Sequence, residues 1–169
     1  MIDKKFDDIA NDIDIDHLEF LMNNTVNGVT HPDRVVKGVI AETIFKKYHP
    51  NVKAVDDADD RRYLFDFWST VDNKTFEVKC FDERAFGGKD LKYISYSHLQ
   101  QLNMYMTDRT LYDGLKPRFV FFTMSGKDPF TATFSCKAIV PFCEMVIEQS
   151  RSRRGCFSYI PPNRLFDKT

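Results

Sequence analysis

The chain has 169 residues, 43% hydrophobic and 29% charged, which is typical of one globular domain large enough to bury a core. Its net charge of −1 excludes a uniformly basic nucleic-acid coat protein, although it allows a local basic surface. No stretch approaches the roughly 20 apolar residues of a membrane span, and the acidic N-terminus lacks the apolar segment of a signal peptide. We therefore expect a cytoplasmic protein, in a cell or a phage-infected host, without a membrane partner.

The N-terminal third of the chain predicts helices. One or two short helices are expected over residues 1–24, followed by a loop over 23–33. A longer helix is expected from an Asp33 N-cap to about residue 49, where Pro50 ends it. Glu42 lies on the apolar face of that helix. A carboxylate there is unexpected, because burying a charge without a partner is costly.

The next segment predicts a β-hairpin. A short strand is expected over residues 51–55, and the charged run 56–62 is interpreted as a solvated loop rather than as metal ligands. Residues 63–68 (YLFDFW) and 75–81 (TFEVKCF) are aromatic and β-branched. The turn-forming residues 72–74 (DNK) separate them. We expect the two segments to pair as antiparallel strands.

The second half of the chain predicts further strands and helices. We expect a loop over residues 82–92, a helix from a cap at Ser95 or Ser97 to about residue 107, and a strand buried on both faces over 118–123. A second strand (130–140), a helix from Pro141 to about residue 150 and an irregular basic tail (151–169) follow. The order of elements indicates an α/β fold with a mixed central β-sheet flanked by helices. One domain is expected over residues 1–169, with its core at about 33–123.

The predicted hairpin brings two carboxylates and an amine to one face. Side chains alternate along a strand, so Glu77 and Lys79 point to one side and Val78 points to the core. If the turn centres on residues 72–73, Asp66 lies across from Lys79. A shift of the pairing by two residues places Asp66 across from Glu77 instead. In both registers the three charged side chains converge.

Two neighbouring carboxylates favour a divalent cation, because without one their repulsion keeps a proton on one of them. Carboxylate and carbonyl oxygens suit Mg²⁺, so we expect Asp66, Glu77 and the Val78 carbonyl as ligands, with Mn²⁺ as a substitute. The metal would lower the pKa of a bound water and offset charge on a phosphodiester. Lys79 would orient or deprotonate that water, or stabilise the pentavalent phosphate.

The pattern D-x10-EVK that starts at Asp66 resembles the PD-(D/E)xK nuclease superfamily, which has the restriction-endonuclease-like fold. The resemblance covers about residues 33–123, and it implies a glutamate-bearing helix, the hairpin, a helix and a strand in that order. Glu42 stands where the helix glutamate is expected, which implies a catalytic and metal-binding role. Phe65 departs from the proline of the motif.

The resemblance implies a metal-dependent deoxyribonuclease, expected to be an endonuclease. Restriction, homing, resolvase and recombination or repair enzymes belong to the superfamily, and phages and mobile elements carry minimal ones. Cutting both strands of a duplex implies a homodimer. One alternative is a catalytically silent member of the same fold that binds DNA or a protein. Another is a structural or inhibitory phage protein of unrelated fold.

DNA contacts are expected from side chains outside the metal site. Gln101 and Tyr105 form a QxxxY pattern similar to one that follows the ExK in RecB-type nucleases, where both side chains lie near the site. An amphipathic helix with an exposed glutamine is the alternative. Further basic and histidine side chains are candidates either for the DNA backbone or for a solvated surface: Lys89, Lys92, His98, Arg151, Arg153 and Arg154.

Other RecB-type features are not clearly present. His31 and His49 are loosely placed candidates for an upstream histidine motif. The cysteines match no paired zinc-binding pattern: Cys80, Cys136, Cys143 and Cys156. We interpret the cysteines as reduced and mostly buried, and a four-cysteine iron–sulfur cluster is the alternative.

Overall fold

The computed structural model describes residues 3–23, 32–54, 65–83, 93–95, 116–141 and 157–159. Its larger sheet contains β1 (Lys4–Lys5), β2 (Val52–Ala54), β3 (Phe67–Ser69), β4 (Lys74–Asp82), β6 (Lys116–Ser125) and β7 (Thr133–Pro141). Within the described ranges, these six strands pair in the order β1-β7-β6-β4-β3-β2. A separate antiparallel pair consists of β5 (Tyr93–Ser95) and β8 (Phe157–Tyr159). The larger sheet is mixed, because β4 and β6 are parallel and its other pairs are antiparallel.

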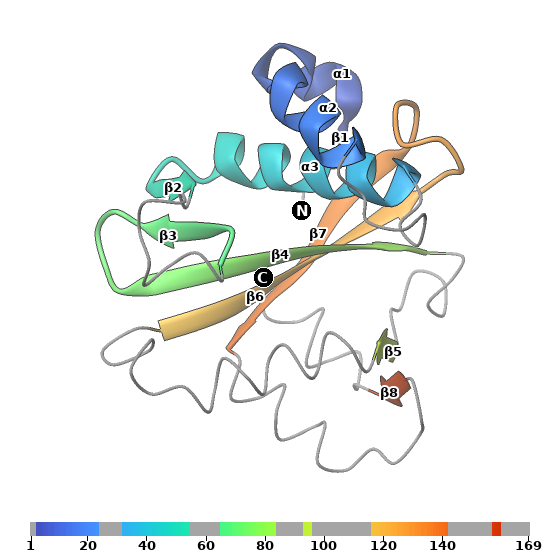
Figure 1. Ribbon diagram of the computed structural model, residues 1–169. Helices are drawn as coiled ribbons and strands as arrows, with labels where there is room; N and C mark the ends of the chain where they lie inside the picture. Colours follow the sequence, from blue (N-terminus) through green and yellow to red (C-terminus); the bar gives the residue numbers. More distant parts are fainter. Residues whose placement is uncertain are drawn as a thin grey trace.

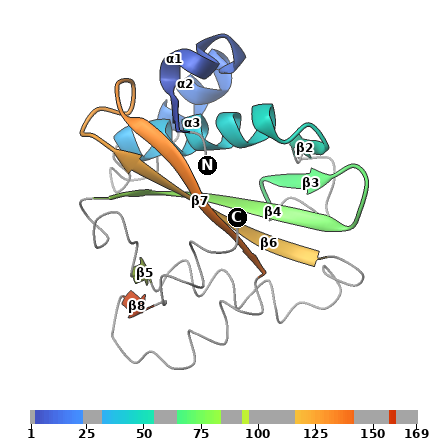
Figure 2. The same ribbon diagram turned by 180° about the vertical axis from the view of Figure 1, so that it is seen from behind.

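Helices cover one face of the larger sheet (Figure 1). They are α1 (Phe6–Ile9), the 3-10 helix η1 (Ala10–Asp12), α2 (Ile15–Asn23) and α3 (Pro32–Tyr48). Helix α3 packs on β4, and α1 and α2 pack on α3, as the view from behind also shows (Figure 2). The sequence-based expectation of a mixed sheet with helices is confirmed. None of the helices in the described ranges is long and apolar enough to cross a membrane.

Apolar side chains at helical spacing fix α3 on the sheet. The buried residues of α3 are Val36, Val39, Ile40, Ala41, Ile44 and Phe45. They join buried residues of four strands, including Phe67, Phe76, Val78, Val120, Phe122 and Phe134, in one apolar cluster. This cluster fixes the α3 face of β4, so residues 76 and 78 face α3 and residues 77 and 79 face away from it.

The first turn of α3 differs from the prediction. The helix begins at Pro32, so Asp33 lies inside the first turn and is not the N-cap. Proline suits this first position because the N–H that it lacks has no partner within the helix. The helix ends at Tyr48, immediately before His49 and Pro50, as the proline predicts.

The register of the β3–β4 hairpin follows the second of the two predicted pairings. Phe67 pairs with Phe76 and Trp68 with Thr75. Continued by one residue, this register places Asp66 across from Glu77, so the pairing of Asp66 with Lys79 was wrong. Strand β3 is also shorter than predicted, since Asp66 lies in a bend immediately before it.

Ser69 explains the shift in register. Its Oγ accepts hydrogen bonds from the backbone N–H groups of Val71 and Asp72, at 3.3 and 3.2 Å. A serine that holds two successive N–H groups initiates a turn. The connection therefore occupies residues 70–73, and its centre moves one residue towards the N-terminus of the predicted position.

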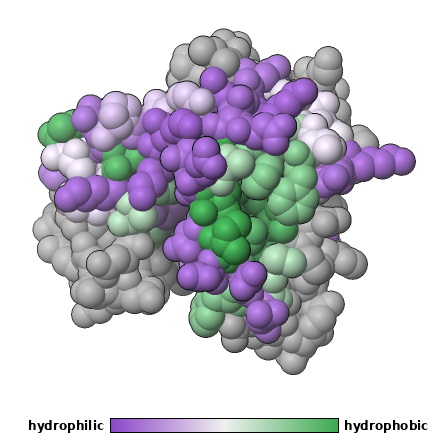
Figure 3. Space-filling model, turned by 90° about the horizontal axis from the view of Figure 1, so that it is seen from above, coloured by the Kyte–Doolittle hydropathy of each residue, from purple (hydrophilic) through white to green (hydrophobic). Residues whose placement is uncertain are grey.

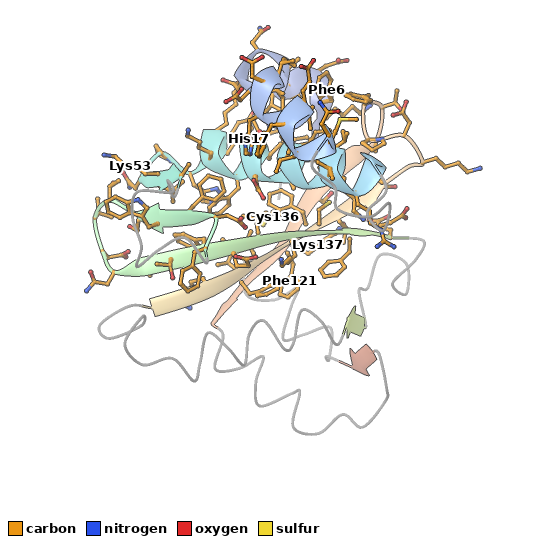
Figure 4. The ribbon with its side chains drawn as sticks, in the orientation of Figure 1. Phe6, His17, Lys53, Phe121, Cys136 and Lys137 are labelled. Carbon is orange, nitrogen blue, oxygen red and sulfur yellow. The ribbon has the colours of Figure 1, made fainter. Side chains whose placement is uncertain are left out.

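The face of the sheet turned away from α3 carries a second apolar group. Strands β4 and β6 pair with Glu77 beside Phe119 and Lys79 beside Phe121. Both phenylalanines are fully buried, and their ring centroids are 4.5 Å apart. Figure 4 shows Phe121 on the side of the sheet opposite α3. Because Phe119 and Val120 are both buried, the prediction of a strand buried on both faces is confirmed for β6.

Three expectations for the second half of the chain have different outcomes. Pro141 is the last residue of β7 and so does not begin a helix, and the rest of the predicted helix, 142–150, lies outside the described residues. Residues 157–159 form β8, so the expected irregular tail is wrong at this point. The predicted helix over 95–107 lies outside the described residues, apart from Ser95, which ends β5.

The outer side of the helical layer is largely hydrophilic, with a compact apolar area near its middle (Figure 3). Two phenylalanines of the helical layer differ in burial. Phe20 of α2 is 61% exposed, whereas Phe45 of α3 is fully buried. The ring centroid of Phe45 lies 5.4 Å from that of Phe67 and 5.2 Å from that of Phe76. These two phenylalanines therefore offer a matched comparison of the same side chain inside and outside the core.

We predict that Phe45→Ala lowers the free energy of unfolding by about 3–5 kcal/mol, because it removes a buried ring and leaves a cavity. The control Phe20→Ala should change it by about 0.5 kcal/mol or less. Urea denaturation of both variants measures the difference. Equal losses in the two variants would contradict the assignment of the core.

Candidate active site

Four side chains predicted to be catalytic come from three elements that meet at β4. Glu42 lies on α3, Asp66 in the bend before β3, and Glu77 and Lys79 on β4 itself. The interactions described below link all four. The structure therefore brings together residues that are up to 37 positions apart in the sequence (79 minus 42).

Asp66 is fixed to β4 at two points. Its backbone N–H donates to the Phe76 carbonyl at 3.0 Å, and its Oδ2 accepts from the Val78 N–H at 2.7 Å. The carboxylate thus continues the hydrogen-bond ladder where β3 has not yet begun. Because a residue in a strand directs its N–H and C=O to the same edge, the Val78 carbonyl also faces the edge where Asp66 lies.

Glu77 and Lys79 form an ion pair on the sheet face opposite α3. Lys79 Nζ lies 2.8 Å from Glu77 Oε1. The Glu77 side chain is 5% exposed and the Lys79 side chain 20%. Phe119 and Phe121 flank the pair on β6 and create an apolar environment, which strengthens electrostatic interactions. The lysine is the side chain of the pair that solvent reaches.

Glu42 and Asp66 are partly buried carboxyls, placed so that a hydrogen bond joins them when one of the two holds a proton. Burial, followed by the nearby Glu77 charge, raises the pKa of Glu42 from 4.5 to about 7. Burial, followed by the charges of Glu77 and Glu42, raises the pKa of Asp66 well above its ordinary value of 3.8. Lys79 and the Val78 N–H oppose the shift at Asp66. Their contributions are smaller than those of burial and of the other two carboxyls.

Three carboxyls with one lysine leave an excess of negative charge in a partly buried site. Oxygen ligands of this kind suit a hard divalent cation, which would offset the repulsion that raises both pKa values. Among the described residues, no three His, Cys, Asp or Glu side chains are already arranged to hold a metal ion together. The donor chemistry fits Mg²⁺ or Mn²⁺, and coordination by Glu77 would compete with its ion pair to Lys79.

Besides the four site residues, three sequence candidates lie in the described part of the chain, one histidine and two cysteines. His49 hydrogen-bonds the Phe45 carbonyl through Nδ1 at 2.9 Å, and its ring stacks on Phe45. Both contacts hold His49 against the last turn of α3. Cys80 of β4 and Cys136 of β7 each pair with Phe122 of β6, and neither is in a disulfide with another described cysteine. Burial raises the pKa of the Cys80 thiol to about 12, which makes it unreactive.

The expected DNA-binding residues lie outside the described residues: Lys89, Lys92, His98, Gln101, Tyr105, Arg151, Arg153 and Arg154. The same holds for His31, the aspartate run 56–60, Cys143 and Cys156. Sequence reasoning missed the two phenylalanines, Phe119 and Phe121, that flank the ion pair. Their aromatic run was visible in the sequence, but nothing local indicated that β6 would pair in parallel with β4.

Neither a scan against protein-family models nor searches of curated proteins and of solved structures found a match for this chain. The site is therefore interpreted from its own geometry and charge.

We predict that Glu42→Gln stabilises the protein at pH 8 relative to the wild type, with little effect at pH 4. Between pH 4.5 and about 7 the native Glu42 holds a proton that the unfolded chain has released. Stability therefore falls as pH rises through this window, by an amount on the order of 3 kcal/mol for the raised pKa. Glutamine keeps the hydrogen-bonding shape and removes the charge.

Thermal unfolding in EDTA at pH 4, 6 and 8 measures the difference between the two proteins. An exposed carboxyl, Asp12, provides the control through Asp12→Asn. A difference between wild type and Glu42→Gln that stays constant with pH would contradict the raised pKa.

Proposed function

We propose that this protein is a metal-dependent nuclease that hydrolyses DNA phosphodiester bonds. The observation that carries the proposal is the convergence of Glu42, Asp66 and Glu77 with Lys79 on the central strand. Such an arrangement suits chemistry on a phosphodiester, because both a metal ion and an ammonium can offset charge that develops on phosphorus-bound oxygens. A surface hairpin would instead leave its charged side chains in solvent.

The order of the elements supports a restriction-endonuclease-like core within the mixed sheet. Helix α3 supplies a glutamate, β3 and β4 follow as a hairpin, and β6 pairs in parallel with β4. This is the sequence of elements that the D-x10-EVK resemblance implies, with the described residues providing all but the helix after the hairpin. Strand β4 lies between β3 and β6 in the sheet. At Glu77–Lys79 it pairs with β6 on one side, and the Asp66 hydrogen bonds take the place of β3 on the other.

In the proposed mechanism, Asp66 and Glu77 would hold the cation, and Glu42 would contribute directly or through water. The Val78 carbonyl oxygen is a further candidate metal ligand, on the edge of β4 where Asp66 lies. A bound Mg²⁺ or Mn²⁺ supplies a water of lowered pKa and offsets negative charge on the scissile phosphate. The hydrogen bond from Val78 to Asp66 keeps one carboxylate oxygen fixed while leaving the other for this role.

Lys79 is proposed to position the attacking water and to stabilise the phosphate. Its Nζ already lies against Glu77, so the ion pair holds the amine beside the metal-binding carboxylates. Its side chain is more exposed than that of Glu77, which gives the substrate access to it. The water oxygen forms a bond to phosphorus in line with the leaving oxygen, whose bond to phosphorus breaks. The proton that the water gives up is balanced by the proton that the leaving oxygen takes up.

Cutting both strands of a duplex at one place would further require two such sites, supplied by two copies of the chain. Size measurements in solution, with and without DNA, test this extension of the proposal.

We predict that plasmid DNA is degraded with Mg²⁺ or Mn²⁺ and that Asp66→Asn and Lys79→Ala each reduce the rate about 100-fold or more, because each removes charge stabilisation in the transition state. Asparagine retains an oxygen that accepts the Val78 N–H, so the fold is preserved. Asp12→Asn, at an exposed ion pair with Lys47, is the matched control and should leave the rate unchanged.

Supercoiled, linear and single-stranded DNA should all be tested, each with and without EDTA. Degradation that persists in EDTA or in both site variants would reject the proposal. Binding of DNA without degradation of any form would favour the silent member of the same fold.

A further inference from the structure

A second row of side chains lies beside the carboxylates on the same face of the sheet. Trp68 of β3 pairs with Lys53 of β2 on one side and with Thr75 of β4 on the other. Side chains two residues apart on a strand share a face, so Thr75 lies on the face of Glu77. Paired residues of neighbouring strands also share a face, which adds Trp68 and Lys53 to it.

Trp68 and Lys53 combine an aromatic ring with a cation at the edge of the sheet. Trp68 is partly exposed, and the Lys53 Nζ lies 5.9 Å from its ring centroid, within range of a cation–π interaction. Lys53 is exposed and projects from β2 at the outer edge (Figure 4). An aromatic ring that binds a base and a cation that binds a phosphate are the two components of single-strand recognition.

A pocket of about 260 Å³ adjoins Trp68. It is lined by residues 68–75, the end of β3, the turn and the start of β4. The volume lies below the roughly 300–1,000 Å³ of sites for drug-sized ligands, which suits one nucleotide moiety rather than a larger ligand. Thr75 lines the pocket and is 1% exposed, and its Oγ1 has no hydrogen-bond partner in the described part of the chain. A buried hydroxyl without a partner is rare, and a polar atom of a bound ligand would satisfy it.

We propose that Trp68, Lys53 and Thr75 form a subsite for an unpaired nucleotide beside the cleaved phosphate. This inference rests on the proposed nuclease function and names its substrate class as DNA with a single-stranded segment at the site. The base stacks on Trp68, Lys53 leaves the ring to contact a phosphate, and the Thr75 hydroxyl hydrogen-bonds the nucleotide.

The spacing of the two rows fits this arrangement. Diagonal neighbours across an antiparallel pair, such as Trp68 and Glu77, have Cα atoms roughly 7–8 Å apart. Successive nucleotides of one strand rise by about 3.4 Å in a duplex and by more when extended. A base on Trp68 would therefore belong to a nucleotide within about two positions of the phosphate at the carboxylates.

Stacking of a base on Trp68 also favours single-stranded DNA over double-stranded DNA. A base inside a duplex has both faces covered by its neighbours, so it can stack on a side chain only after leaving the helix. An unpaired base offers its face without that cost, and stacking of this kind tolerates any sequence. The subsite therefore favours single-stranded DNA over a duplex of the same sequence.

Trp68 is the only tryptophan of the 169 residues, so its fluorescence reports on this subsite alone. The experiment titrates the full chain in EDTA with a single-stranded oligonucleotide and, separately, with its fully paired duplex. Tryptophan emission follows the subsite, and the anisotropy of an end-labelled copy follows binding anywhere on the protein. We expect saturable quenching by the single strand and much weaker quenching by the duplex.

Substitutions of Trp68 and Lys53 test the contribution of each side chain to single-strand binding. Trp68→Ala should weaken single-strand binding by about 5- to 100-fold, and Trp68→Phe should retain most of it, because a phenyl ring still stacks. Lys53→Gln should lower the slope of log affinity against log salt by about one. The control is Lys127→Gln, an exposed lysine in the turn between β6 and β7 at the other end of the sheet, which should leave the slope unchanged (Figure 1).

The outcomes separate this proposal from the nuclease proposal. Anisotropy that reports binding without a change in tryptophan emission overturns the subsite and leaves the nuclease standing. Equal quenching by the duplex overturns the preference for an unpaired nucleotide. Quenching by the single strand without metal-dependent cleavage supports the nucleotide subsite and rejects the nuclease. Failure of both DNA forms to bind overturns the subsite.

Discussion

The hydrogen bond from the Val78 N–H to Asp66 Oδ2 links the candidate site to the fold. Val78 itself packs beneath α3, so the strand that presents its N–H is held by the apolar core. Asp66 precedes β3 and would otherwise lie at the end of a three-residue strand. Its second bond, from its own N–H to the Phe76 carbonyl, orients the carboxylate towards β4. The core therefore determines where the Asp66 charge lies.

The position of the Asp66 carboxylate beside β4 has an electrostatic consequence. Glu42 approaches from the helix and Glu77 from the strand, so three carboxyls compete for one region with a single lysine. Burial and mutual repulsion raise the pKa values of Glu42 and Asp66, so the folded protein favours protonation or a cation at this site. The phenylalanines beside Glu77 and Lys79 on β6 exclude water from one side and increase the effect.

The sequence allowed part of this arrangement to be predicted. Pro50 predicted the C-terminal end of α3 to within a residue, and alternation predicted that Glu77 and Lys79 oppose Val78. The pairing of β3 with β4 was left between two registers, because the choice depends on Ser69 holding the N–H groups of the turn. The parallel pairing of β4 with β6 is a tertiary contact, so neither Phe119 nor Phe121 could be assigned to the site.

The most direct test of the central claim is the binding of Mn²⁺ to the wild type and to Asp66→Asn, measured at pH 7.5 by the loss of the free-ion paramagnetic resonance signal. We predict that the wild type takes up Mn²⁺ and that Asp66→Asn binds it about tenfold or more weakly, since one charged ligand is lost. Asp12→Asn should bind like the wild type. Equal binding by wild type and Asp66→Asn, or no binding by either, would contradict the claim that these carboxyls form a cation site.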